Sequence, residues 1–182
     1  MKFTALRPWW PWIATFAAFP PAGLLGKAVA GPVDSGASAT VAGLTAGAVL
    51  GAGQWLLLRR HGIAGRWVAA TAAGFGVGLT AGAAAVGYRT DAASLAVMGA
   101  VTGAAVGVAQ AAAVRSNAVA WGAATAALWA LGWTVTSGVI DTAEQWPVFG
   151  SSGALTVVAL QSLFLTHLLP VPTHHTTLEL KP

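Results

Sequence analysis

Long runs of apolar residues, separated by short polar segments, divide the chain into six stretches. Asp, Glu, Lys and Arg are absent from residues 8–26, 35–58, 67–88, 92–114, 116–140 and 145–178. About 20 apolar residues in a helix are enough to cross the hydrocarbon core of a bilayer, and each stretch can hold such a span. The pattern therefore predicts six transmembrane helices, at 9–31, 38–58, 66–87, 93–114, 118–140 and 147–169.

The predicted fold class is all-α, in an integral membrane protein. The stretches are too long for barrel strands of about 10 residues, and they lack the alternating polarity of such strands. Only 8% of the residues are charged and 56% are hydrophobic. A water-exposed surface normally needs about 25% charged residues, so most of this surface is expected to face lipid.

A pattern of small residues followed by glutamine recurs along the chain. Its copies are Gly43, Gly47, Gly51 and Gln54; Gly99, Gly103, Gly107 and Gln110; and Gly150, Ala154, Val158 and Gln161. A tryptophan opens each odd-numbered predicted helix, as Trp12, Trp67 and Trp121. Features in a constant order indicate an internal repeat. We expect one transmembrane domain, 1–169, made of three tandem hairpins (9–60, 64–116 and 118–169) in a pseudo-threefold bundle, followed by a polar cytoplasmic tail, 170–182.

The basic residues predict the orientation of the chain. With six spans, one side holds Lys2, Arg7, Arg59, Arg60, Arg66, Arg115 and Lys181, and the other holds Lys27 and Arg89. Basic residues are enriched in cytoplasmic loops, so both termini are predicted to be cytoplasmic, in a bacterial inner membrane. The alternative is cleavage of residues 1–30 as a signal peptide after Ala28-Val29-Ala30. The participation of the first helix in the repeat argues against cleavage.

The repeated glycines are predicted to pack helices. Gly43, Gly47 and Gly51 fall within about 80° of one another around a helix, and Gln54 continues their stripe. Small residues let membrane helices approach closely. The buried amides of Gln54, Gln110 and Gln161 need partners. They either form separate interhelical hydrogen bonds or converge as a polar ring near the cytoplasmic face.

Other polar and aromatic positions have simpler expected roles. Six tryptophans are predicted to lie in the belt of aromatic residues at the cytoplasmic interface: Trp9, Trp10, Trp12, Trp55, Trp67 and Trp121. Three acids are predicted on the outer side, where they cap helices or attract cations: Asp34, Asp91 and Asp141. Lys27 is expected to reach the outer interface and to pair with Asp34.

Catalytic and metal-binding arrangements are not predicted. Gly150-Ser-Ser-Gly153 resembles the GxSG motif of rhomboid intramembrane proteases. His167, however, is placed on the same helix as Ser152, about 22 Å away along the axis. A Ser–His pair needs hydrogen-bonding contact. The chain contains no cysteine. We expect no catalytic residues, no metal, no cofactor and no nucleic-acid partner.

The segment GAGQWLLLRR at 51–60 resembles a pattern found in bacterial multi-pass membrane proteins whose repeated glycine-rich helices end in Gln-Trp. The resemblance implies no activity. The expected function is that of a non-enzymatic scaffold or accessory subunit, with the bilayer, other membrane proteins or a second copy as partners. The alternative is a passive channel or transporter for small solutes.

Overall fold

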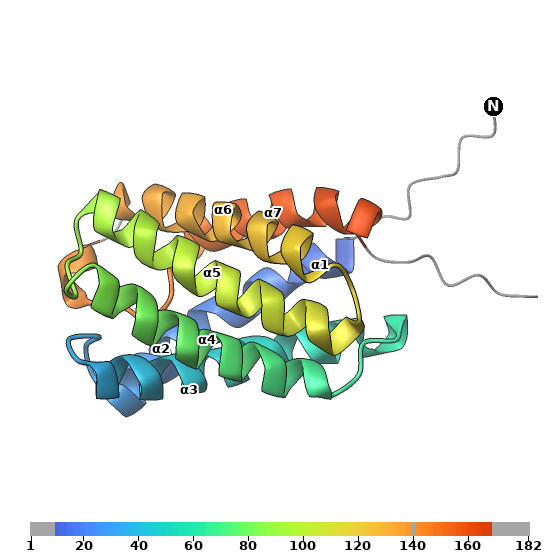
Figure 1. Ribbon diagram of the computed structural model, residues 1–182, viewed down its shortest axis with the longest axis horizontal. Coiled ribbons are helices and arrows are strands. Elements are labelled where there is room, and N and C mark those ends of the chain that lie inside the picture. Colours follow the sequence, from blue (N-terminus) through green and yellow to red (C-terminus); the bar gives the residue numbers. More distant parts are fainter. Residues whose placement is uncertain (1–9, 140, 169–182) are drawn as a thin grey trace, which may run out of the picture.

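The computed structural model is a bundle of helices that run along one long axis (Figure 1). It describes residues 10–139 and 141–168. The predicted tail 170–182 lies outside these residues, as do Trp9 and residue 169 at the ends of two predicted repeats. Every regular element in the described ranges is helical, which confirms the predicted all-α class.

The helices follow one another in this order: α1 (Trp10–Ala14), η1 (Thr15–Ala18), α2 (Phe19–Ala30), α3 (Gly36–Leu58), η2 (Arg59–His61), α4 (Arg66–Ala85), α5 (Ala92–Val114), α6 (Ala118–Ser137), η3 (Thr142–Glu144) and α7 (Ser151–Leu168). The four helices from α3 to α6 lie within three residues of their predicted bounds. The first and last predicted helices differ more from the structure.

The first span is broken into α1, the 3-10 turn η1, and α2. Pro20 and Pro21 stand in the first turn of α2. Proline suits that position because its fixed φ is helical and its missing N–H is not needed there. Inside a continuous helix the same residues would remove hydrogen bonds. Two prolines in the middle of the predicted span 9–31 indicate such an interruption, and the structure places it at Thr15–Ala18.

The last helix begins at Ser151, four residues later than predicted. Val148 and Phe149 precede it and are buried. The ring of Phe149 stacks on that of Phe19, with 5.2 Å between centroids. This segment therefore enters the core as a loop, and α7 begins once Phe149 is in place, with Ala154 N donating to Gly150 O.

Short polar side chains cap the starts of α3, α5 and α6, whereas α4 follows Gly65 without a side-chain cap. Ser35 forms a capping box with Ser38 at the start of α3. Asp91 caps α5, and Asn117 caps α6. Such caps supply acceptors for backbone N–H groups that have no partner within the helix. Asp34 is not the cap residue of α3, because Ser35 takes that place.

Five helices in the described part are long and apolar enough to cross a membrane: Trp12–Ala30, Gly36–Leu58, Arg66–Ala85, Ala92–Val114 and Ala118–Ser137. These helices indicate a multi-pass membrane protein. The sixth predicted span corresponds to α7, which runs from Ser151 to Leu168. Its side chains are described only through Leu163, and over Ser151–Leu163 it is an apolar helix too short to be counted with the other five.

The chain closes on itself. Each helix from α2 to α6 contacts its successor, and α7 contacts α1, η1 and α2. Consecutive long helices run in opposite directions, so their connections alternate between the two ends of the bundle (Figure 1). The helices therefore surround a shared interior.

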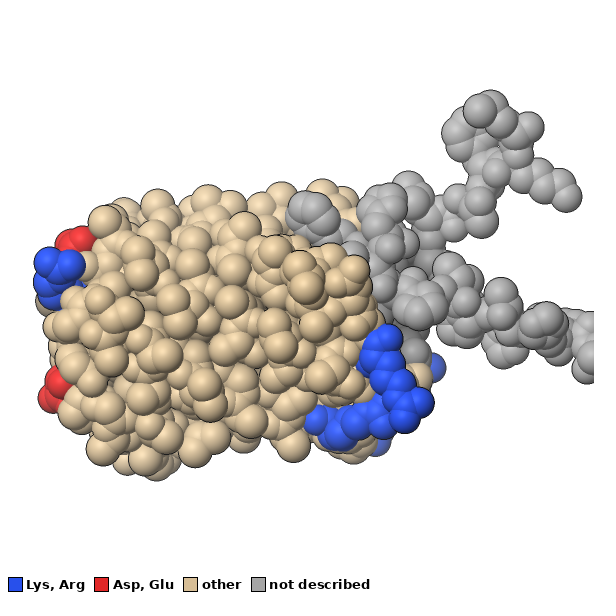
Figure 2. Space-filling model, in the orientation of Figure 1, with Lys and Arg blue, Asp and Glu red and all other residues tan. Residues whose placement is uncertain are grey.

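The two ends of the bundle differ in charge (Figure 2). We call one end basic, because its connections carry Arg59, Arg60, Arg66 and Arg115. We call the other end acidic. Its connections carry Asp34, Asp91, Asp141 and Glu144, together with Arg89. The long surface between the two ends is almost free of charge in the view of Figure 2.

Candidate functional site

The three repeated glutamines are all buried. Gln54 is 4% exposed, Gln110 2% and Gln161 8%. They lie in α3, α5 and α7, each in the half of its helix nearer the basic end. A buried amide has two donors and one acceptor oxygen, so its partners decide what it does.

Two of these glutamines join one hydrogen-bonded network, which we call the polar centre. Gln54 Oε1 accepts from Trp67 Nε1 at 2.9 Å and from Gln110 Nε2 at 3.3 Å. Gln110 Nε2 also donates to Thr71 Oγ1 at 3.0 Å. Gln110 Oε1 accepts from Trp121 Nε1 at 3.4 Å. The polar centre thus joins α3, α4, α5 and α6 through side chains alone.

Local sequence explains why Thr71 can take part. It stands one helical turn after Trp67, and its hydroxyl donates to Trp67 O at 2.8 Å. With its proton used inside α4, the Thr71 oxygen is left as an acceptor. Gln110 from α5 supplies the matching amide donor.

Three tryptophan rings lie against each other beside the polar centre. Trp12 and Trp67 meet edge to face with centroids 6.2 Å apart, and Trp67 and Trp121 do so at 6.1 Å. All three are buried. The prediction of an interfacial position is therefore wrong for these three tryptophans, whereas Trp55 is only partly buried and Trp9 lies outside the described residues. For Trp67 and Trp121, glutamine oxygens inside the bundle replace the water that an interfacial indole N–H would meet.

The third glutamine stands apart from the other two. No hydrogen bond of the Gln161 side chain occurs within the described ranges, and none links it to Gln54 or Gln110. Trp12 Nε1 is buried and has no hydrogen-bond partner among the described residues. Two glutamines therefore converge, and the predicted ring of three does not close through direct hydrogen bonds.

The glycine stripes face neighbouring helices of the same chain. A Cβ added at Gly43 would lie 2.8 Å from Phe75 O, and one at Gly51 would lie 2.9 Å from Thr71 Cβ, both in α4. A Cβ at Gly103 would lie 2.6 Å from Thr125 O in α6. Gly47, Gly99 and Gly107 make equally close approaches. Larger residues at these positions would push the helices apart.

Sequence reasoning missed a further stripe, on α4. Cβ atoms added at Gly74, Gly78 and Gly82 would each lie 2.8 Å from atoms of α5. Their spacing of four residues was visible in the sequence and is the same as in the stripes that were predicted. Helix α4 thus packs closely against both α3 and α5. We call each such close helix contact a seam, and Gly74, Gly78 and Gly82 form the seam with α5.

Aromatic rings fill the interior beyond the polar centre. Phe75 meets Trp129 at 5.1 Å, and Trp129 meets Phe149 at 5.3 Å. Trp133 also meets Phe149, at 6.0 Å. These rings come from α4, α6 and the loop before α7. Rings in such contact leave little space for water along this part of the interior.

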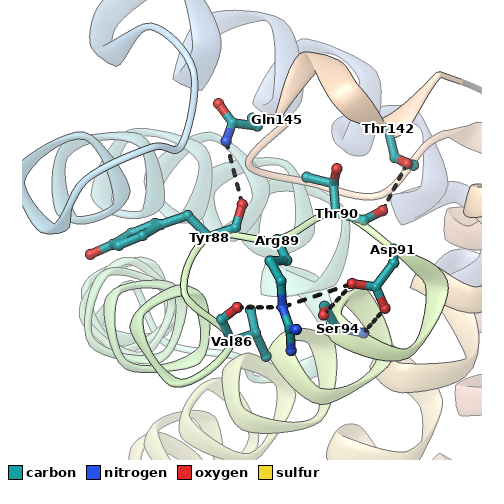
Figure 3. A network of polar contacts seen from close by, with 8 residues as sticks. All are labelled: Val86, Tyr88, Arg89, Thr90, Asp91, Ser94, Thr142 and Gln145. Atoms are coloured by element: carbon teal, nitrogen blue, oxygen red, sulfur yellow. Dashed lines mark hydrogen bonds and ion pairs between the residues drawn. The ribbon is translucent and has the colours of Figure 1, made fainter.

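A second polar cluster lies at the acidic end (Figure 3). Asp91 accepts from Ser94 N at 3.0 Å and from Ser94 Oγ at 2.6 Å. Arg89 Nε donates to Val86 O at 3.1 Å and lies 4.0 Å from Asp91 Oδ2. The hydrogen bonds from the Ser94 side chain and backbone, and then the charge of Arg89, lower the pKa of Asp91 below its ordinary value of 3.8. Such contacts keep the carboxyl charged as a helix cap.

The connection before α7 packs onto this cluster. Gln145 Nε2 donates to Tyr88 O at 3.4 Å, and Thr142 Oγ1 donates to Thr90 O at 3.0 Å (Figure 3). Tyr88 and Gln145 both have left-handed backbones, with φ of 58° and 53°. An indentation of about 10 Å³ lies between these residues, with room for about one water molecule.

The other acids at this end act locally. Asp34 Oδ1 accepts from Ser38 Oγ at 3.2 Å, and Asp141 Oδ1 accepts from Ala143 N at 2.9 Å. All three predicted acids, Asp34, Asp91 and Asp141, thus accept hydrogen bonds from residues within four positions of their own in the chain.

Lys27 pairs with a different acid from the one predicted. Its Nζ lies 2.5 Å from Glu144 Oε2 and 4.0 Å from the centre of the Trp146 ring. The predicted pair with Asp34 is therefore wrong. Closure of the bundle brings the loop after α6 beside α2, and this contact is not visible in local sequence.

The residues considered for catalysis and metal binding lie as follows in the described part of the chain. Ser152 Oγ is buried and has no partner among them. His167 follows 15 residues later on the same helix, which matches the predicted separation. Within residues 10–139 and 141–168, no three His, Cys, Asp or Glu side chains are grouped so that they could hold a metal ion.

Comparisons with protein-family models, with curated proteins and with solved structures find no match.

Proposed function

We propose that this protein is a non-enzymatic scaffold or accessory subunit of a bacterial inner membrane, with both termini cytoplasmic. The observation that carries the proposal is the use of its interior. Buried polar groups of Gln54, Gln110, Trp67 and Trp121 bond to one another. Their hydrogen-bonding capacity is therefore used between helices of the same chain. The outer apolar surface remains available for binding other molecules.

The proposal includes three hairpins around a pseudo-threefold axis. Two kinds of contact recur and support it. The stripe of α3 meets α4 as the stripe of α5 meets α6. Gln54 accepts from the tryptophan that opens α4, as Gln110 does from the one that opens α6. The contacts of α7 with α1 and α2 bring the third hairpin against the first, so the three hairpins form a closed ring.

The filled interior weighs against the alternative of a passive channel. Water or solute on the axis would have to pass the edge-to-face rings of Trp12, Trp67 and Trp121. It would then meet the contact of Phe75 with Trp129. A permeation path needs polar groups with free hydrogen-bonding capacity, and most of those in the polar centre are paired.

The first span supplies the most exposed surface for a partner. Only 28% of its apolar window is buried, against 39% to 44% for the other four candidate spans. Leu24 is 60% exposed and Val29 62%. The glycine stripes named above face other helices of the same chain, so a partner would bind elsewhere, and the α2 face is our proposed site.

Two measurements on the full chain test this function. In native purification with mild detergent, a partner membrane protein should co-migrate with this protein at a fixed ratio. The variant Leu24→Trp should no longer bind that partner. Val77→Trp on α4 is the matched control, since Val77 is equally apolar and 69% exposed. In proteoliposomes, flux of water and glycerol should equal that of empty vesicles. If the protein instead conducts water or glycerol, and Gln110→Leu abolishes this flux without unfolding the protein, the scaffold function is rejected in favour of a channel.

A further inference from the structure

Trp12 is the member of the tryptophan cluster whose N–H has no partner. The residue is 2% exposed, and the N–H donates to no other group in the described part of the chain. Its neighbour Trp67 donates to Gln54, and Trp121 donates to Gln110. An indole N–H buried without an acceptor is costly and therefore rare in folded proteins.

Gln161 stands where the acceptor for Trp12 is expected. It is the third of the repeated glutamines, and its helix α7 contacts α1, which carries Trp12. Gln161 is buried, and no hydrogen bond of its side chain occurs within the described ranges. Thr125 stands four residues after Trp121, as Thr71 does after Trp67; it is also buried, and its hydroxyl bonds to no other group in the described part of the chain.

Val158 explains why the third pair does not close directly. It stands three residues before Gln161, where Gly51 stands before Gln54 and Gly107 before Gln110. A Cβ added at Gly51 would lie 2.9 Å from Thr71 Cβ, so that seam admits no side chain. The buried isopropyl group of Val158 occupies space that the glycines leave to the neighbouring helix.

We propose that Trp12 and Gln161 form a binding site for one water molecule, which bridges the indole N–H and the glutamine amide. Buried water typically binds where about three polar groups converge, and the Thr125 hydroxyl can supply the third. The first two junctions are direct hydrogen bonds, whereas a water molecule bridges the third. This inference does not depend on the scaffold role.

The test is nuclear magnetic resonance of the full chain labelled with ¹⁵N at the indole positions, in lipid nanodiscs. Trp12→Phe assigns the Trp12 signal. We expect a cross-peak between the Trp12 indole proton and a long-lived water, and no such cross-peak for Trp67 or Trp121. A Trp12 proton without a water cross-peak would overturn the proposal; the cross-peak itself is measured on the natural protein, and Trp12→Phe serves only for the assignment.

Two variants test whether the water next to the Trp12 indole is held by Gln161. Gln161→Met should remove the water cross-peak of Trp12 and leave the Trp67 and Trp121 signals in place. Gln54→Met, the matched control, should shift the Trp67 signal and keep the Trp12 cross-peak. A Trp12 cross-peak that survives Gln161→Met at full strength would exclude Gln161 from the site and so reject the bridge.

Discussion

Replacing Gly103 by alanine should destabilise the bundle, whereas the same change at Gly23 should not. Both glycines are buried inside helices. The added Cβ at Gly103 would lie 2.6 Å from Thr125 O and 2.8 Å from Trp129 Cβ. At Gly23 the nearest atom is Val148 Cβ at 3.8 Å, an ordinary contact. The pair therefore compares one chemical change in two steric settings.

The size of the effect follows from the seam between α5 and α6. A shift from 2.6 Å to an ordinary contact of 3.4 Å moves the facing carbonyl by about 0.8 Å. A backbone atom cannot rotate away, so the helices have to separate. A gap of 0.5–1 Å removes roughly a quarter to a half of the dispersion energy of each affected atom pair. We expect a loss of about 2 kcal/mol in unfolding free energy, as is typical of overpacking.

Gly23→Ala should change the unfolding free energy by less than about 1 kcal/mol, in the stabilising direction, because alanine favours helix. The assay is reversible unfolding in mixed micelles with increasing dodecyl sulfate, followed by tryptophan fluorescence. Equal stability of the two variants would refute the steric argument. If only Gly23→Ala lost stability, the tight helix contact would lie at Gly23 and not between α5 and α6 at Gly103.

Three further perturbations test the polar groups. Gln110→Met should lower the unfolding free energy by about 2 kcal/mol in the same assay. The change leaves the buried indole N–H of Trp121 and the hydroxyl of Thr71 with fewer partners. An unchanged unfolding free energy would mean that water replaces the amide. Asp91 has a lowered pKa, so its capping contribution is complete above the ordinary value of 3.8 and is lost as the pH falls through the folded value. The melting temperature of the natural protein should therefore drop more steeply below pH 4 than that of Asp91→Asn, and parallel curves would contradict this. Lys27→Met should cost less than about 1 kcal/mol, because its partner Glu144 is half-exposed and such pairs contribute little; a larger loss would point to the packing of the lysine stem on Trp146.

Residue spacing predicted the helices well because it reports on local physics. The absence of charge over about 20 residues is enough to mark a span, and glycine every fourth residue marks a face that another helix can approach. Gly43 to Gly51 and Gly99 to Gly107 lie on such faces. The same rule applied to Gly74, Gly78 and Gly82 would have found the seam of α4 with α5.

The partners of individual side chains were less predictable. A tryptophan at a helix start looks the same in sequence whether it meets lipid headgroups or a glutamine inside the bundle. Trp67 lies 13 residues after Gln54, and Trp121 lies 11 after Gln110. This recurrence was a usable signal, although its meaning depends on how the hairpins pack. The choice of Glu144 over Asp34 by Lys27 depends on closure of the whole chain.

The closure of α7 on the first span has a consequence for the order of assembly. Lys27 reaches Glu144 across 117 residues, Val33 N donates to Gln145 O, and Phe19 stacks on Phe149. None of these contacts can form until the last hairpin has been synthesised, whereas the seams of α3, α4 and α5 join neighbours in the chain. Because a chain is synthesised from its N-terminus, α2 stays without these contacts until the loop before α7 has been made. Closure of the bundle is therefore the last step of its assembly.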